Sequence, residues 1–175
     1  MSDFRFCPRC ARPLHQGEQG GFMRAVCPDA ACGFVHWDNP TPVVAAVVEH
    51  DGAIVLARNK LWAHRFFGLI TGFLEKNEDP AEAVLREVEE ELGLKGSAPS
   101  FIGHYTFERM NQLIVAYHVM AEGEIRLGEE LSEYIRVPPE QARYWPAATG
   151  LALRDWLVSR GHTPEVIEMP VRRKG

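Results

Sequence analysis

A nearly continuous hydrophobic run occupies residues 43–49 (VVAAVVE), a pattern typical of a strand that is buried on both faces of a sheet. Asp51 and Gly52 follow as a turn signal, and residues 53–57 are expected to return as the hairpin partner of that strand. Further strands are predicted at residues 101–107, 112–120 and 134–137. The chain therefore contains enough strands for a sheet.

A helix is predicted within residues 72–94 (GFLEKNEDPAEAVLREVEEELGL), after residues 66–73 have led into a loop. Asp79 is a suitable N-cap, Pro80 suits the first helical position, and Glu82 completes a capping box. Gly93 stands where such a helix would end. The residues expected on the buried side are Ala81, Val84, Leu85, Val88 and Leu92.

A second helix is predicted at residues 148–159. Its apolar side carries Leu151, Leu153, Trp156 and Leu157. Strands before and after the first helix, with another helix at the end, predict an α/β fold in which a mixed sheet carries helices on its faces. The chain of 175 residues is long enough to bury a core, and its 46% hydrophobic and 25% charged residues are ordinary for a globular protein.

Three carboxylates on the first helix suggest chemistry. Glu87, Glu90 and Glu91 are spaced i, i+3 and i+4, which puts them on one helical face. Like charges in such proximity repel, and a hard cation such as Mg²⁺ or Mn²⁺ would neutralise them while bridging to substrate phosphates. We therefore hypothesise a metal-dependent enzyme that acts on a phosphate ester or anhydride. An ordinary solvated acidic face is the alternative.

The same stretch resembles the Nudix box, G-x5-E-x7-R-E-U-x-E-E-x-G-U, where U is aliphatic. The matching positions are Gly72, Glu78, Arg86, Glu87, Val88, Glu90, Glu91, Gly93 and Leu94. The resemblance implies the α/β/α sandwich of the Nudix hydrolases. It also implies the activity of that family, which cleaves nucleoside diphosphates linked to another moiety.

The resemblance further implies roles for individual residues. Glu87, Glu90 and Glu91 correspond to the metal-binding glutamates. As an alternative, one of them orients or deprotonates the attacking water instead of binding metal, and Glu87 is the favoured candidate for that role. Arg86 corresponds to the arginine that pairs with a carboxylate of the box, for which Glu78 is the candidate. Gly72 corresponds to the loop glycine whose carbonyl can complete the metal shell. Mg²⁺ or Mn²⁺ is the implied catalytic cofactor.

A further carboxylate from outside the box is expected to join the Mg²⁺ or Mn²⁺ site. Glu129, Glu130 and Glu133 precede the strand predicted at residues 134–137. We favour Glu130, because its local pattern resembles a segment of Nudix enzymes that carry a zinc ribbon. A solvated acidic loop remains the alternative.

The four cysteines predict a second metal site. Cys7 and Cys10 form one close pair, and Cys27 and Cys32 form another. This spacing is typical of a tetrahedral zinc site of the ribbon type, which would stabilise a segment too short for its own core. Two disulfides are the alternative, but no secretory signal is evident, and in the cytoplasm that we expect, thiolates bind metal.

A ribbon beside a Nudix box resembles the subgroup that includes NADH, ADP-ribose and FAD pyrophosphatases. Members that act on NADH carry SQPWPFPxS after the box, whereas this chain reads HYTFERMNQLIVAYH, so the resemblance does not extend to NADH specificity. We expect a zinc ribbon at residues 1–37 with a structural role, a Pro-rich linker at 38–42, and a Nudix domain over 38–175. The zinc-ribbon relatives suggest a homodimer.

Charge and hydropathy limit the partners. The formal net charge of −5 argues against binding to nucleic acid through bulk electrostatics, and no apolar run is long enough for a transmembrane helix. A small nucleotide remains compatible, because a metal can bridge two anions. Arg58 and Arg65 are candidates for contacting its phosphates, and Phe67 for stacking on its base.

Two functions follow from these patterns. The first is a metal-dependent hydrolase that cleaves the pyrophosphate bond of a nucleoside diphosphate linked to another moiety, of the ADP-ribose, FAD or NADH type. The second is a non-catalytic nucleotide sensor whose ribbon recruits a partner. The intact box favours the enzyme, because a sensor has no need for all three glutamates.

Overall fold

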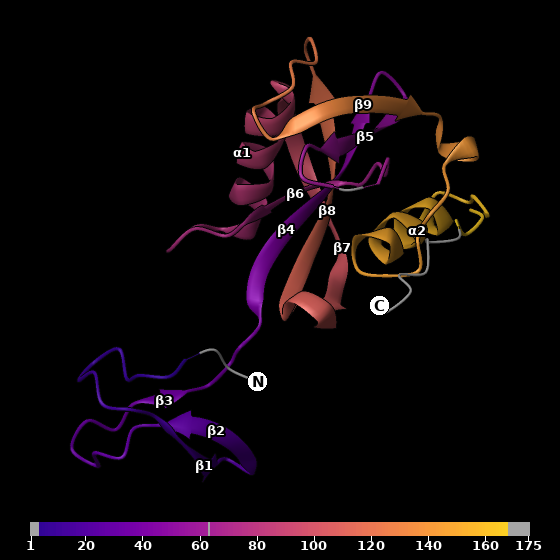
Figure 1. Ribbon diagram of the computed structural model, residues 1–175. Helices are drawn as coiled ribbons and strands as arrows, with labels where there is room; N and C mark the ends of the chain where they lie inside the picture. Colours follow the sequence, from indigo (N-terminus) through magenta and orange to yellow (C-terminus); the bar gives the residue numbers. More distant parts are fainter. Residues whose placement is uncertain (1–3, 63, 168–175) are drawn as a thin grey trace. The chain divides into compact units, whose positions relative to one another are not determined.

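The computed structural model describes residues 4–62 and 64–167, and the chain divides between Pro40 and Thr41 into two compact units. The N-terminal unit contains a three-stranded antiparallel sheet in the order β1-β2-β3 (Figure 1). Its strands are β1 (His15–Gln19), β2 (Phe22–Val26) and β3 (Val35–His36). Gly20 and Gly21 join the first two through backbone with positive φ, which glycine adopts without strain.

The second unit is built on a six-stranded mixed sheet. Its strands are β4 (Thr41–His50), β5 (Ala53–Asn59), β6 (Ile70–Phe73), β7 (Lys95–Phe107), β8 (Gln112–Glu122) and β9 (Leu131–Val137). The sheet order is β7-β8-β4-β5-β9, and β6 pairs with β4. Only β4 and β8 run parallel among these pairs. The predicted mixed sheet is therefore confirmed.

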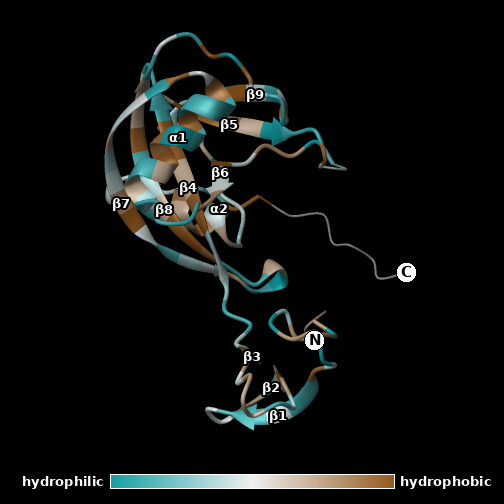
Figure 2. Ribbon diagram, turned by 90° about the vertical axis from the view of Figure 1, so that its left-hand side faces the viewer, coloured by the Kyte–Doolittle hydropathy of each residue, from teal (hydrophilic) through white to brown (hydrophobic). Residues whose placement is uncertain are grey.

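The central strand β4 has a core on each face, which explains its unbroken hydrophobic sequence. Val44, Ala46 and Val48 pack with the buried residues of α1 (Pro80–Leu92). Val43, Ala45 and Val47 pack with those of α2 (Thr149–Ser159). Hydrophobic residues accordingly concentrate in the middle of the sheet (Figure 2). Among the described residues, no helix has the length and apolarity to cross a membrane.

Helix α1 begins and ends at the predicted residues. The Asp79 side chain accepts a hydrogen bond of 2.8 Å from the backbone N–H of Ala81, and Pro80 opens the helix. Gly93 ends it in the left-handed region, with φ of 66°. The predicted buried side was wrong in part: Ala83 is fully buried, whereas Ala81 and Leu85 are only half-buried. The face that α1 turns to the sheet is therefore centred slightly differently from the one predicted.

Several element boundaries differ from the prediction. β4 begins at Thr41, so the last two residues of the expected linker already belong to the sheet. β6 starts only at Ile70, and the segment before it makes a single bridge between Gly68 and Ala57. β7 starts at Lys95, six residues before the predicted start. Two register shifts in its pairing with β8, typical of β-bulges, interrupt the alternation of side chains along its first half. Two 3₁₀ turns, Glu108–Met110 and Pro139–Gln141, complete the elements.

A buried histidine links the sheet to α2. His118 of β8 lies 2.9 Å from a carboxylate oxygen of Glu49 on β4, and its ring stacks on Trp156 of α2 at 5.0 Å between centroids. Arg160 also reaches Glu49, at 3.3 Å. Burial lowers the pKa of His118, although the contact with Glu49 acts in the opposite direction.

We predict that protonation of His118 destabilises the fold. Because its pKa is lower in the folded protein, the unfolded chain binds the proton first, so stability is lost as the pH falls below about 6.5. Urea titrations at about pH 7.5 and about pH 5.5 should therefore show a smaller loss of unfolding free energy for His118→Gln than for wild type. His104→Gln, at an exposed histidine of β7, is the control and should behave as wild type. Equal losses in all three proteins would contradict the prediction.

Candidate functional site

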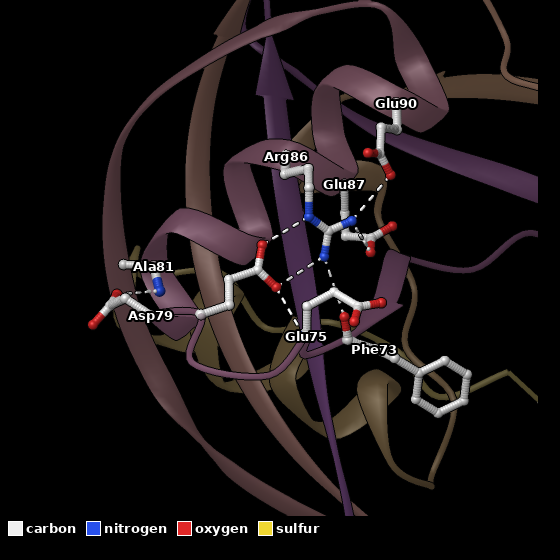
Figure 3. Close-up of polar contacts among 8 residues, drawn as sticks. Phe73, Glu75, Asp79, Ala81, Arg86, Glu87 and Glu90 are labelled. Carbon is white, nitrogen blue, oxygen red and sulfur yellow. Dashed lines mark hydrogen bonds and ion pairs between the residues drawn. The ribbon is translucent and has the colours of Figure 1, made fainter.

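The Arg86 guanidinium organises the polar face of α1 (Figure 3). Its Nε donates to Glu78 at 2.7 Å and its Nη2 to the other oxygen of Glu78 at 3.0 Å, the paired geometry that suits a guanidinium and a carboxylate. Nη2 also donates to the Phe73 carbonyl at 3.2 Å. Nη1 donates to Glu87 at 2.7 Å and to Glu90 at 3.0 Å. Arg86 thus ties the loop before α1 to the helix and to two of its carboxylates.

The loop carboxylate is held in its ionised form. Hydrogen bonds from Arg86, together with one of 2.9 Å from the backbone N–H of Glu75, lower the pKa of Glu78 to about 2. The pairing of Arg86 with Glu78 that the sequence suggested is therefore present. Its reach to Glu87 and Glu90 was not foreseen, because spacing along the chain does not reveal how far a folded loop brings the guanidinium toward the helix.

Glu87 lies against the backbone of β6. A Cβ added at Gly72 would come within 1.8 Å of the Glu87 carboxyl carbon, so only glycine leaves room for this side chain. Burial raises the pKa of Glu87, and Arg86 counteracts that effect. The glycine predicted to approach the metal site is therefore in contact with one of the predicted ligands. Whether its carbonyl completes a metal shell stays a prediction.

The position of Glu91 is unfavourable for a negative charge. Burial, followed by the charges of Glu87, Glu130 and Glu90, raises the pKa of Glu91 to about 8. The charge of Glu130 acts on this group although Glu130 lies 39 positions further along the chain. Its side chain also accepts a hydrogen bond of 3.4 Å from Asn59 at the end of β5. The structure therefore brings the favoured extra carboxylate to the predicted ligands.

The other two acidic candidates near Glu130 have different roles. Glu133 forms an ion pair of 2.7 Å with Arg58 and another of 2.9 Å with Arg65, and these contacts lower its pKa. The backbone carbonyl of Glu129 accepts a hydrogen bond from the Lys60 ammonium. The two arginines predicted to bind phosphate thus gather around one carboxylate.

The aromatic candidate Phe67 lies close to these arginines. The Arg65 guanidinium is 5.9 Å from the centre of the Phe67 ring. The ring is half-buried and packs against the core under α2. A role in stacking on a base stays a prediction for this residue.

The four cysteines of the N-terminal unit converge. Their sulfur atoms all lie within 4.8 Å of one another, and the Sγ atoms of Cys7 and Cys32 are 3.6 Å apart, those of Cys10 and Cys27 3.5 Å. A disulfide requires about 2 Å, whereas zinc–sulfur bonds of about 2.3 Å in a tetrahedron put sulfurs slightly under 4 Å apart. None of these four cysteines forms a disulfide. The arrangement fits a tetrahedral metal site rather than two disulfides.

Electrostatics within the cysteine cluster also favours a cation. Burial raises the pKa of Cys7, but hydrogen bonds from backbone N–H groups and neighbouring thiols outweigh it and bring that pKa to about 7. Burial, followed by the neighbouring sulfurs, raises the pKa of Cys32 to about 12. Four adjacent thiols cannot all ionise unless a cation offsets their charge.

The glutamates fit a different ion. Carboxylate oxygens suit Mg²⁺ or Mn²⁺, and the raised pKa of Glu91 marks a half-buried group whose ionised form a divalent cation would stabilise. The carboxylates are less tightly gathered than the thiols: across residues 4–62 and 64–167, only the four cysteines form a group of three or more His, Cys, Asp and Glu with ligand atoms within 4.8 Å. Repulsion and the pull of Arg86 on Glu87 and Glu90 account for this spread.

Comparisons with known proteins agree with this arrangement. Residues 38–157 match the family model of the NUDIX domain. The NAD-capped RNA hydrolase NudC of Stutzerimonas stutzeri is 30% identical over 126 residues, which are 71% of this chain and 44% of that protein. This chain therefore spans less than half the length of the first curated relatives that it matches.

Solved structures share the fold. A NUDIX hydrolase from Nitrosomonas europaea superposes with a TM-score of 0.76 at 20% identity, covering 94% of this chain and 97% of the other. An ADP-ribose pyrophosphatase from Streptococcus suis gives 0.57 at 18% identity, covering 73% and 98%. Because the NUDIX domain match extends over more than half of the chain, this protein belongs to the Nudix family.

Proposed function

We propose that this protein is a Mg²⁺- or Mn²⁺-dependent hydrolase that cleaves the pyrophosphate bond of a nucleoside diphosphate linked to another moiety. The observation that carries the proposal is the Glu91 carboxyl, half-buried near Glu87, Glu90 and Glu130 with a pKa raised to about 8. A fold gains nothing from such a group by itself, because burying a charge without an opposite one costs free energy. Functional sites accept that cost when a ligand offsets it.

We assign separate roles in metal binding, proton transfer and positioning to the residues of the site. Glu87, Glu90, Glu91 and Glu130 would hold the metal, with Gly72 leaving room for Glu87. A bound divalent ion would polarise the pyrophosphate oxygens and lower the pKa of a coordinated water. Glu87, with its pKa raised by burial, is our candidate for orienting or deprotonating the attacking water in place of a ligand role. Arg86 and Glu78 would keep the loop and helix in register during turnover.

Substrate choice would depend on the side of the site near β9. Arg58 and Arg65 already share the Glu133 carboxylate, and a phosphate could replace that carboxylate as their partner. One similar protein is named for NAD-capped RNA and another for ADP-ribose. Each of these two compounds contains a nucleoside diphosphate linkage. We therefore propose this linkage as the substrate class. A role as a non-catalytic sensor would leave the unfavourable Glu91 without a function.

For the N-terminal unit we propose a structural zinc ion held by Cys7, Cys10, Cys27 and Cys32. Such a small sheet gains most of its stability from the metal. A cytoplasmic location and a homodimer stay predictions.

The proposed activity is tested by product analysis. Purified protein should hydrolyse ADP-ribose, FAD, NADH, NAD-capped RNA or a dinucleoside polyphosphate, with mass spectrometry locating the cleaved bond within the pyrophosphate. Chelation should abolish the reaction and added Mg²⁺ or Mn²⁺ should restore it. A reaction that survives chelation, or binding of these compounds without hydrolysis in saturating metal, would contradict the proposal.

Replacing Glu91 should separate function from stability. Glu91→Gln is expected to lower kcat about 100-fold, equivalent to roughly 3 kcal/mol of transition-state stabilisation. Glu89→Gln, at an exposed position on the same helix, is the matched control and should retain activity.

The same variant should stabilise the metal-free protein at high pH. The folded-state pKa of Glu91 lies above its usual value, so its ionisation costs stability from about pH 4.5 upward and fully above about pH 8. Thermal unfolding without metal should give Glu91→Gln a higher Tm than wild type in alkaline buffer and no advantage in acid. An equal or lower Tm at alkaline pH would argue against the buried, unpaired charge.

Metal analysis tests the cysteine site. We expect about one zinc per chain and four thiols that react with a thiol reagent only after zinc is removed. Removing zinc should unfold the N-terminal unit, seen as loss of its dispersed amide signals in NMR. Zinc-free protein with a mass lower by the four hydrogens that are lost when two disulfides form would contradict this assignment.

A further inference from the structure

A segment after β8 closes over the end of α1. Residues 123–130, which we name the strap, connect β8 to β9. The backbone N–H of Arg126 donates to the Leu92 carbonyl at 2.7 Å, and that of Gly128 to the Glu91 carbonyl at 2.8 Å. Carbonyls in the last turn of a helix have no partner within the helix, so the strap supplies donors that α1 needs.

Gly128 touches α1 so closely that a side chain has no room. A Cβ at this position would lie 2.5 Å from the Glu90 carbonyl oxygen and 3.3 Å from the Glu91 Cα. Both are backbone atoms, which cannot rotate away as a flexible side chain would. Gly128 does not have the positive φ seen at Gly123, so the close approach, rather than the backbone conformation, requires glycine here.

The strap ends at the carboxylate that stands beside Glu91. The backbone carbonyl of Glu130 accepts a hydrogen bond of 2.9 Å from the Lys60 N–H, and its side chain accepts one from Asn59. Leu131 donates to the Gly128 carbonyl at 3.3 Å, which closes a tight turn around Glu130. Glu130 is therefore held between two supports, the end of β5 on one side and Gly128 on the other.

We propose that Gly128 is a positioning residue for the metal site, which sets the distance between Glu130 and the glutamates of α1. This inference rests on the proposed function. A methyl group at position 128 would push the strap away from α1, while the pairing of β5 with β9 keeps the rest of the sheet in place. The consequence is local: Glu130 moves away from Glu91, and the ion loses one ligand at its proper distance.

Mn²⁺ affinity measures this effect without relying on catalysis. Zinc-loaded protein is titrated with Mn²⁺ alone, and electron paramagnetic resonance reports the free ion. Gly128→Ala should raise the Mn²⁺ Kd roughly 10- to 100-fold, the range for losing a group that orients a metal site. Inserting one glycine after Gly128 should also weaken binding, because it loosens the strap without adding a side chain. In kinetic assays at subsaturating metal, both variants should show a larger fold-decrease in kcat than fold-change in the KM for the nucleotide.

Two controls isolate the mechanism. Gly96→Ala places a methyl against the side chains of Leu85 on α1 and Val119 on β8, where no strap backbone is in contact, and should bind Mn²⁺ as wild type does. In a Glu130→Gln background, Gly128→Ala should have no additional effect on the Kd, because its influence passes through Glu130.

The outcomes separate this inference from the proposed function. If Glu91→Gln binds Mn²⁺ as tightly as wild type, the proposed metal site is wrong. If Glu91→Gln loses Mn²⁺ while Gly128→Ala and the insertion keep wild-type affinity, only the positioning role is wrong. Additive effects of Gly128→Ala and Glu130→Gln on the Mn²⁺ Kd would also overturn the positioning role. Loss of the folded circular dichroism spectrum in both strap variants would overturn it too, because the strap would then be needed for folding.

Discussion

Repulsion among carboxylates along one side of α1 is the constraint on which the site depends. Glu91 is half-buried near three other glutamates, and this environment raises its pKa to about 8. Arg86 offsets charge on Glu78, Glu87 and Glu90, and none of its ion pairs within the described residues is with Glu91. The protein therefore carries an electrostatic cost in one place, which a divalent cation would relieve.

The surrounding structure makes that cost tolerable. The N-cap of α1, the hydrophobic contacts of Val84 and Val88 with the sheet, and the double hydrogen bond between Arg86 and Glu78 fix the helix independently of any metal. Two glycines then let backbone approach where side chains would interfere, Gly72 below Glu87 and Gly128 above the end of the helix. Rigid support of this kind is what a site needs if its charged groups are to converge.

Local sequence patterns predicted the parts of the structure that local physics controls. The buried β4, the ends of α1 and the glutamate face of that helix follow from periodicity and capping. The gathering of four cysteines follows from their spacing in two close pairs. The resemblance to the Nudix box added the pairing of Arg86 with Glu78, and the resemblance to Nudix enzymes with a zinc ribbon pointed to Glu130; periodicity can supply neither.

Contacts between distant segments were not predictable in the same way. The approach of Gly128 to the Glu90 carbonyl depends on how a loop returns over a helix, and a glycine in an acidic stretch gives no signal of it. The ion pairs of Glu133 with Arg58 and Arg65 depend on the register between β5 and β9. Register and loop closure are set by the whole sheet, so they emerge only in three dimensions.

The most direct test of the account is anomalous diffraction from crystals soaked in Mn²⁺ with a non-hydrolysable nucleoside diphosphate analogue. The account predicts an anomalous peak bounded by the carboxylates of α1 and Glu130, with the diphosphate of the analogue reaching the same ion. A peak elsewhere, or a diphosphate seated away from α1 while these carboxylates hold no ion, would contradict it.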